Sequence, residues 1–128
     1  MKKLLSTEQS ATLIAKGISA DKASGQGERI YKPVVLQNGK TKRVFDGYEP
    51  IFTLADICAL LPKEIVTDTI MCEDDVCPIS IRWDKNCQKW FVGYDLVPHP
   101  VGVGVDSELI DALFSTLCWV IEKNFLTK

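Results

Sequence analysis

The most apolar stretch of the chain lies near its C-terminal end, in residues 106–126. Its hydrophobic side chains recur every three or four residues, at Leu109, Leu113, Leu117, Val120 and Ile121. Others widen this stripe: Ile110, Phe114, Cys118 and Trp119. Polar residues keep only a narrow line, at Glu108, Asp111, Ser115 and Glu122. Because a helix this apolar must be largely buried, we predict that it forms the centre of the core, with Asp106 or Ser107 as its N-cap.

A shorter helix is predicted near the N-terminus, where Ser6 and Gln9 have the spacing of a capping box. Apolar residues follow at helical spacing: Ala11, Ile14, Ala15 and Ile18. Gly17 stands where a helix commonly ends. Ser19 could cap one further short helix over residues 20–24. This arrangement faintly suggests helix-turn-helix, although the second helix would be too short to read a major groove.

A second short helix is predicted over residues 54–61, capped by Thr53 and ended by Pro62. Three strand candidates follow it, at residues 65–72, 78–83 and 88–94. In the second and third candidates, apolar and polar residues alternate. This alternation puts the following side chains on a common face: Ile79, Ile81, Trp83, Trp90, Val92 and Tyr94. We predict an antiparallel meander whose aromatic face receives the C-terminal helix. A loop or short extended edge follows over residues 95–105.

A hairpin is predicted between the two short helices. Residues 29–36 have the character of an edge strand, because Pro33 cannot donate a hydrogen bond to a ladder. Asn38-Gly39 is typical of a hairpin turn, and residues 40–45 form the return strand. Asp46-Gly47 indicates a further turn after it.

Together these elements predict a single α+β domain over residues 1–128. Its N-terminal segment, residues 1–27, is helical, and residues 28–128 hold the sheet and the other helices. The sheet is predicted to be antiparallel with three to five strands, the higher number applying if the hairpin extends it. It packs against the long C-terminal helix, with the two shorter helices beside it.

The composition is that of a globular protein, because 46% of the 128 residues are hydrophobic and 25% are charged. No run reaches the ~18 apolar residues of a membrane span. The basic start of the chain lacks the apolar run that a signal peptide needs. We therefore expect a cytoplasmic protein with no membrane partner. The odd number of cysteines fits free thiols in a reducing compartment: Cys58, Cys72, Cys77, Cys87 and Cys118.

Charge is distributed unevenly along the chain. Residues 1–45 carry nine Lys and Arg against three acids, whereas residues 46–128 carry six against fourteen. The hairpin holds five of the basic residues, interleaved with Tyr31 and Phe45: Arg29, Lys32, Lys40, Lys42 and Arg43. Such interleaving is typical of a polyanion-binding ribbon, and hairpin tips project into solvent, so we predict an exposed binding ribbon. The alternatives are lysines that only protect an edge strand, and neutralisation by acids such as Glu73, Asp74 and Asp75.

Other candidate sites have weaker patterns. Four residues could in principle hold zinc, although their spacing is irregular: Cys72, Cys77, Cys87 and His99. No metal or cofactor is therefore expected. A catalytic Cys–His pair would need a thiol close to His99. Residues 102–104, Gly-Val-Gly, resemble a phosphate-binding loop only weakly, because acidic residues follow them, and a turn eased by glycine is the favoured interpretation.

These observations favour a non-enzymatic interaction or accessory protein. Its partner would be an unidentified protein, or a second copy that it contacts through Phe114 and Trp119. The first alternative is a nucleic-acid-binding protein that uses residues 29–43. The second is an enzyme or metal protein that uses His99 and the cysteines.

Four segments together resemble a family of small proteins from gut anaerobic bacteria, their phages and their mobile elements: STEQSATLIAKGIS, FTLADICALLPKEI, IRWDKNCQKWFVGYD and ELIDALFSTLCWVIEKNFL. The resemblance covers most of the chain. The resemblance implies a compact intracellular protein without an assigned activity, and it suggests an origin in a phage or mobile element. It transfers no functional residue to this chain.

Overall fold

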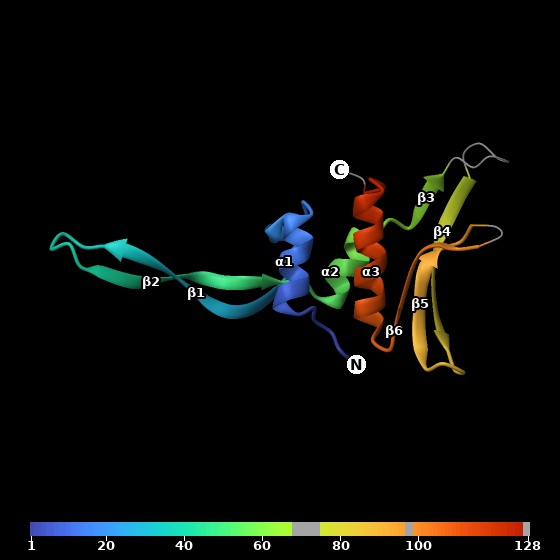
Figure 1. The fold of residues 1–128 in the computed structure, drawn as a ribbon, viewed down its shortest axis with the longest axis horizontal. Coiled ribbons are helices and arrows are strands. Elements are labelled where there is room, and N and C mark those ends of the chain that lie inside the picture. The colour runs from blue at the N-terminus through green and yellow to red at the C-terminus, as the bar shows by residue number, and fades with distance from the viewer. Residues whose placement is uncertain (68–74, 97–98, 127–128) are drawn as a thin grey trace.

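The computed structural model describes residues 1–67, 75–96 and 99–126. It confirms the predicted α+β class, with a long C-terminal helix packed against an antiparallel sheet and two shorter helices (Figure 1). The elements follow in this order: α1 (Thr7–Ala15), a 3-10 turn (Ala20–Lys22), β1 (Gly25–Val35), β2 (Thr41–Ile51), α2 (Leu54–Leu60), β3 (Glu64–Thr67), β4 (Asp75–Asp84), β5 (Lys89–Tyr94), β6 (Val101–Asp106) and α3 (Leu109–Glu122). Strands β1 and β2 form a two-stranded ribbon, and the other strands form a sheet in the order β3-β4-β5-β6.

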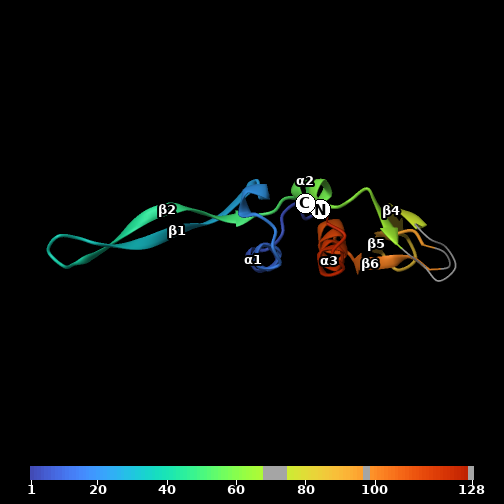
Figure 2. The same cartoon turned by 90° about the horizontal axis from the view of Figure 1, so that it is seen from above.

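Helix α3 lies at the centre of the molecule, between α1 on one side and strands β5 and β6 on the other (Figures 1 and 2). Six of its side chains are buried: Ile110, Ala112, Leu113, Thr116, Leu117 and Val120. Ser115 and Glu122, on the predicted polar line, are exposed. The predicted phase of the helix is therefore confirmed. Its N-cap is Glu108 rather than Asp106 or Ser107, because β6 continues through Asp106.

Two glycines of β6 let α3 pack directly against that strand. The segment predicted as a loop or short extended edge contains β6, which pairs antiparallel with β5. A Cβ at Gly104 would overlap the Ala112 carbonyl oxygen, and a Cβ at Gly102 would overlap the Trp119 ring. The glycines therefore serve helix–strand packing. The interpretations of residues 102–104 as a turn and as a phosphate-binding loop are both wrong.

Buried hydroxyl groups fix how the helices sit on their neighbours. The Thr116 hydroxyl lies 3.1 Å from the Val92 carbonyl oxygen on β5 and 2.8 Å from the Gly102 carbonyl oxygen on β6. On α1, the Ser10 hydroxyl accepts a hydrogen bond from the Phe52 backbone N–H at 3.2 Å. Because an unpaired buried polar group costs about 1–3 kcal/mol, these contacts hold both helices in a defined position.

Helix α1 begins and ends where predicted, and Ile14 and Ile18 pack in the core as predicted, but the rest of the buried face differs. The Ser6 capping box is formed, and Gly17 follows the helix with φ at +108°. Ser10 and Leu13 are buried, whereas two positions predicted as core are exposed: Ala11 and Ala15. The face turns this way because the small Ser10 meets the backbone of Phe52. The three-residue 3-10 turn that follows is too short for a recognition helix, so the helix-turn-helix interpretation is wrong.

The four-stranded sheet confirms the predicted meander and adds β6 at its edge. The predicted strand over residues 65–72 begins within β3, and its continuation beyond Thr67 lies outside the described residues. Trp119, proposed above as a contact for a second copy, stacks between Tyr94 and Phe125, with ring centroids 6.5 and 5.4 Å away. Most of this ring therefore packs inside the fold.

The hairpin forms a separate two-stranded sheet and does not extend the four-stranded one. It is also longer than predicted, because β1 begins at Gly25 and β2 continues through Asp46-Gly47 to Ile51. The register between the strands shifts close to this dipeptide, and Gly47 has φ at +110°. Asp46-Gly47 is therefore part of a β-bulge and not a turn. The sequence does not separate the two, because a β-bulge and a turn both commonly place glycine at positive φ.

The buried phenol of Tyr94 predicts a loss of stability at alkaline pH. Its hydroxyl donates a hydrogen bond to the Pro62 carbonyl oxygen at 2.7 Å, and burial raises the pKa of Tyr94 to about 12. The ordinary pKa of tyrosine is about 10, so the fold favours the neutral phenol. This contribution is complete below pH about 10 and is lost as the pH rises through about 12.

Ultraviolet absorbance of tyrosinate, measured for wild type and Tyr94→Phe across alkaline pH, checks this expectation. The difference between the two curves should show a step at about pH 12. A step at the ordinary pKa, about 10, would mean that Tyr94 is not buried in solution.

Candidate functional site

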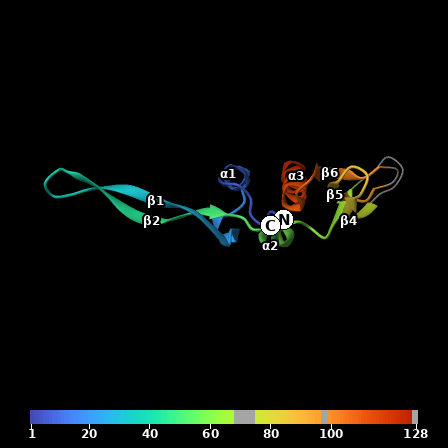
Figure 3. The same cartoon turned by 90° about the horizontal axis from the view of Figure 1, so that it is seen from below.

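The ribbon of β1 and β2 projects away from the helices and the sheet in all three views (Figures 1, 2 and 3). Each strand has 11 residues, so at about 3.3 Å per residue the tip lies roughly 30 Å from the base. At the tip, the Gly39 N–H donates to the Leu36 carbonyl oxygen at 2.9 Å, and Gly39 has φ at +78°. The predicted Asn38-Gly39 turn is confirmed. An arm of this shape exposes both of its faces.

The base of the ribbon is anchored to the body. Asp56 of α2 accepts hydrogen bonds from the Ser24 N–H and hydroxyl at 2.8 and 2.9 Å, and from the Thr53 N–H at 2.9 Å. Burial raises the pKa of the Asp56 carboxyl, but these hydrogen bonds outweigh it and hold the pKa below its usual value. The Leu5 N–H donates to the Phe52 carbonyl oxygen at 3.0 Å, just after β2. The arm therefore leaves the body from a fixed base.

One face of the ribbon, here called the aromatic–arginine face, carries five residues: Arg29, Tyr31, Arg43, Phe45 and Tyr48. Paired residues of an antiparallel ladder share a face, and the register pairs Tyr31 with Phe45 and Arg29 with Tyr48. The ring centroids of Tyr31 and Phe45 are 6.2 Å apart, and those of Phe45 and Tyr48 are 5.3 Å apart, both edge to face. The Arg43 guanidinium lies 5.3 Å from the Tyr31 centroid. The rings are 41–50% exposed, so the row lies on the surface.

The opposite face, here called the lysine face, combines lysines with aliphatic side chains. The register pairs Lys32 with Val44 and Lys42 with Val34. The Lys32 ammonium lies 3.6 Å from an Asp46 carboxylate oxygen, and both side chains are at least half exposed. An exposed ion pair of this kind contributes little to stability and leaves Lys32 accessible. The two faces therefore differ in chemistry although both are basic.

All five predicted binding residues are exposed on the ribbon: Arg29, Lys32, Lys40, Lys42 and Arg43. No acidic residue lies between positions 29 and 45. Of the acids predicted to neutralise the ribbon, Asp75 begins β4, on the far side of α3 (Figure 1). The other two, Glu73 and Asp74, lie outside the described residues.

Tyr48 belongs to the aromatic–arginine face, although the alternation of residues along β2 does not predict this. Strict alternation along β2 would place Tyr48 on the face opposite Phe45, because three positions separate them. The bulge at Asp46-Gly47 adds one residue to β2 and brings both rings to the same face. The spacing Phe-Asp-Gly-Tyr is the signal that could have indicated this, because a bulge commonly contains glycine at positive φ.

The described cysteines and His99 form no metal site. Cys77 is buried on β4, whereas Cys87 is exposed in the turn beyond the other end of that strand. His99 is also exposed, and Cys72 lies outside the described residues. Across residues 1–67, 75–96 and 99–126, no group of three His, Cys, Asp or Glu side chains is arranged to hold a metal ion.

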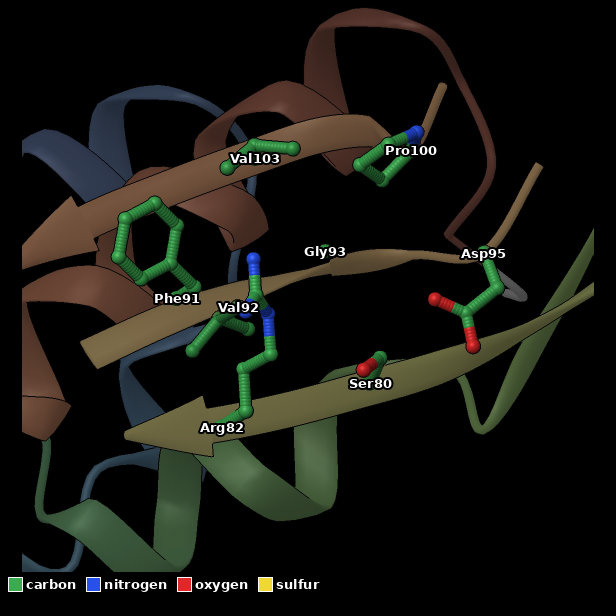
Figure 4. A pocket seen from close by; sticks show the side chains of 8 residues that line it. All are labelled: Ser80, Arg82, Phe91, Val92, Gly93, Asp95, Pro100 and Val103. Carbon is green, nitrogen blue, oxygen red and sulfur yellow. The ribbon is translucent and has the colours of Figure 1, made fainter. Parts of the chain in front are cut away.

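A small hollow lies on the face of the sheet that α3 leaves uncovered (Figure 4). Arg82, Ser80 and Asp95 are its charged and polar lining residues, and Gly93 lies between them. The Arg82 guanidinium lies 4.9 Å from the Phe91 ring centroid. The hollow holds about 50 Å³, whereas ligand pockets commonly hold about 300–1,000 Å³. Its size therefore does not suit a substrate.

Comparison of the chain with protein families, with curated proteins and with solved structures finds no match. Within the part of the chain that the structure describes, no helix is both long and apolar enough to cross a membrane. The ribbon is a candidate site because it combines exposed basic and aromatic side chains on a projecting arm.

Proposed function

We propose that this protein is a non-enzymatic binding protein that contacts nucleic acid through the β1–β2 ribbon. The observation that carries the proposal is a set of five exposed basic residues on an arm with no acid between positions 29 and 45. A nucleic acid presents regularly spaced phosphates to such an arm. Each phosphate that a cation neutralises releases condensed counterions, and this release favours binding.

The separation of charge supports the proposal. Outside the ribbon, residues 1–24 and 52–128 carry fourteen acids against ten basic residues, a net negative charge that would repel a polyanion. Charges are largely screened beyond a Debye length, which is about 8 Å at physiological salt. The tip stands roughly 30 Å from the base of the ribbon, estimated from strand length. The acidic body therefore leaves the attraction at the tip intact and confines contact to the ribbon.

The exposed apolar side chains of the ribbon also favour a binding role. Tyr31, Phe45 and Tyr48 form a continuous row of rings, and these residues are 41–50% exposed. Single exposed apolar residues are normal, but a contiguous group usually marks a binding surface. A two-stranded hairpin is only marginally stable by itself, so a partner that covers these side chains would also stabilise the arm.

Replacing Lys40, Lys42 and Arg43 by Ala should weaken binding to nucleic acid and reduce its dependence on salt. Each lost phosphate contact lowers the slope of log affinity against log salt by about 0.7–0.9, so three contacts change it by roughly 2–3 units. Titration of labelled single- and double-stranded DNA and RNA, starting at low salt, measures the affinity and the slope.

The matched control removes three exposed basic residues from the body, through Lys63→Ala, Lys85→Ala and Lys89→Ala. It makes the same change in net charge and should leave the slope nearly unchanged. If wild type binds none of the four nucleic acids, or if both triple variants behave alike, the proposal is wrong. An acidic protein would then be the partner to test next.

A further inference from the structure

We propose that the aromatic–arginine face holds a single-stranded nucleic acid, with unpaired bases stacked on its rings and phosphates bound by its arginines. This inference rests on the proposed function and names the form of nucleic acid that the ribbon takes. Tyr31, Phe45 and Tyr48 are each about half exposed or slightly less, at 41–50%. Aromatic rings that are accessible on a basic surface are the usual platform for unpaired bases.

The spacing of the rings favours a single strand. Neighbouring ring centroids are 6.2 and 5.3 Å apart, whereas bases in a duplex follow one another at about 3.4 Å along each strand. Because adjacent rings also meet edge to face, a base does not fit between them. Each ring instead offers its own exposed surface to a separate base, which requires a strand whose bases are unstacked.

The arginines complete the site at both ends of the row. Arg43 lies over Tyr31 on the tip side of the rings, and Arg29 is paired with Tyr48 on the base side. A guanidinium binds phosphate oxygens through two parallel hydrogen bonds and can also stack on a base. A strand that follows the rings would therefore pass an arginine as it enters and as it leaves.

Charge argues against a second copy of this chain on the same face. This face carries Arg29 and Arg43, and residues 29–45 hold no acid, so two aromatic–arginine faces brought together would repel each other. A duplex could still bind through its phosphates, but its paired bases are stacked on one another and would leave the rings unused. A single strand uses both the charges and the rings.

The first experiment compares one labelled oligonucleotide sequence as a single strand and as a duplex, with wild type and with Tyr31→Ile, Phe45→Ile and Tyr48→Ile separately. Isoleucine removes the ring but keeps an apolar residue that suits a strand. Wild type should bind the single strand roughly tenfold or more tightly than the duplex. Each ring variant should weaken single-strand binding by roughly five- to a hundredfold, with little effect on the duplex.

Val44→Thr, on the lysine face, is the matched control and should bind both forms as wild type does. If the duplex binds as tightly as the single strand, or if the ring variants bind the single strand normally, the inference is wrong. Binding that still depends on Lys40, Lys42 and Arg43 would then leave the proposed function standing. If no nucleic acid binds at all, both proposals fail together.

Ultraviolet cross-linking of unaltered protein avoids any effect of substitution on folding. A single strand that carries a photoreactive pyrimidine should cross-link to Tyr31, Phe45 or Tyr48, as located by mass spectrometry of the digested complex. Cross-links confined to the lysine face or to the body would overturn the inference.

Discussion

Gly104→Val should prevent α3 from docking on β6 in its present position and strongly destabilise the protein. A Cβ at this position would overlap the Ala112 carbonyl oxygen, and it would lie 3.0 Å from the Thr116 hydroxyl. The carbonyl belongs to the helix backbone and cannot rotate away, so the clash can be relieved only by moving the helix off the strand. We expect a loss of at least about 3 kcal/mol, the upper part of the range for overpacking. The stability of a whole domain is about 5–15 kcal/mol.

Urea unfolding followed by circular dichroism measures this loss. Val105→Ala is the control, because Val105 is the next residue of the same strand, lies on its other face and is 43% exposed. The free energy of unfolding of the Val105→Ala variant should differ from that of wild type by less than about 1 kcal/mol. If Gly104→Val unfolds at the same urea concentration as this control, α3 does not rest on β6 in the way described.

The beginnings of α1 and α2 could be predicted because a helix cap is a local structure. Ser6 and Gln9 lie three positions apart, and Thr53 and Asp56 do as well, so each pair can close its capping box without any distant contact. The burial of α1 depends instead on a segment about forty positions away. Because Ser10 meets the Phe52 backbone there, Ala11 and Ala15 are exposed, although their spacing predicts them to be buried.

From its own residues, the segment that contains β6 could be predicted only as a loop or a short extended edge, and the structure shows the second alternative. The sequence Gly-Val-Gly-Val alternates as a strand does, but glycine is common in turns. The sequence before it, Asp-Leu-Val-Pro-His-Pro-Val, does not alternate between apolar and polar residues. Gly102 and Gly104 make room for α3, and the sequence of the strand does not show where α3 lies. Glycine lowers the strand propensity of a segment, but it can also mark the place where a helix packs against that strand.

The candidate site was predictable in composition but not in arrangement. The five basic residues and the Asn38-Gly39 tip follow from the sequence, since both are local. Their division into an aromatic–arginine face and a lysine face depends on the register of β1 against β2. Two irregularities shift that register, and the one at Asp46-Gly47 has the same sequence signal as a turn. Tyr48 therefore joins the site only in the folded chain.

Leu117→Ala should reduce the free energy of unfolding by about 2–5 kcal/mol, the range for emptying a well-packed site. The Leu117 side chain is fully buried, as are Leu113 and Val120, which lie about one turn to either side of it on α3. Its loss leaves a cavity in the core, and α3 cannot move to close the gap without losing the contacts of Thr116 and Ala112 with the sheet.

Ser115→Ala, two positions away on the same helix, separates this effect from any change in helix propensity. Ser115 is exposed, and its hydroxyl donates to the Asp111 carbonyl oxygen of its own helix, at 3.2 Å. Its stability should stay within about 0.5 kcal/mol of wild type. Chemical denaturation of both variants provides the comparison. Equal losses would mean that α3 is rotated about its axis relative to the orientation described. The packing of Gly104 against Ala112 would then be wrong as well, because that contact and the burial of Leu117 require the same rotation of the helix.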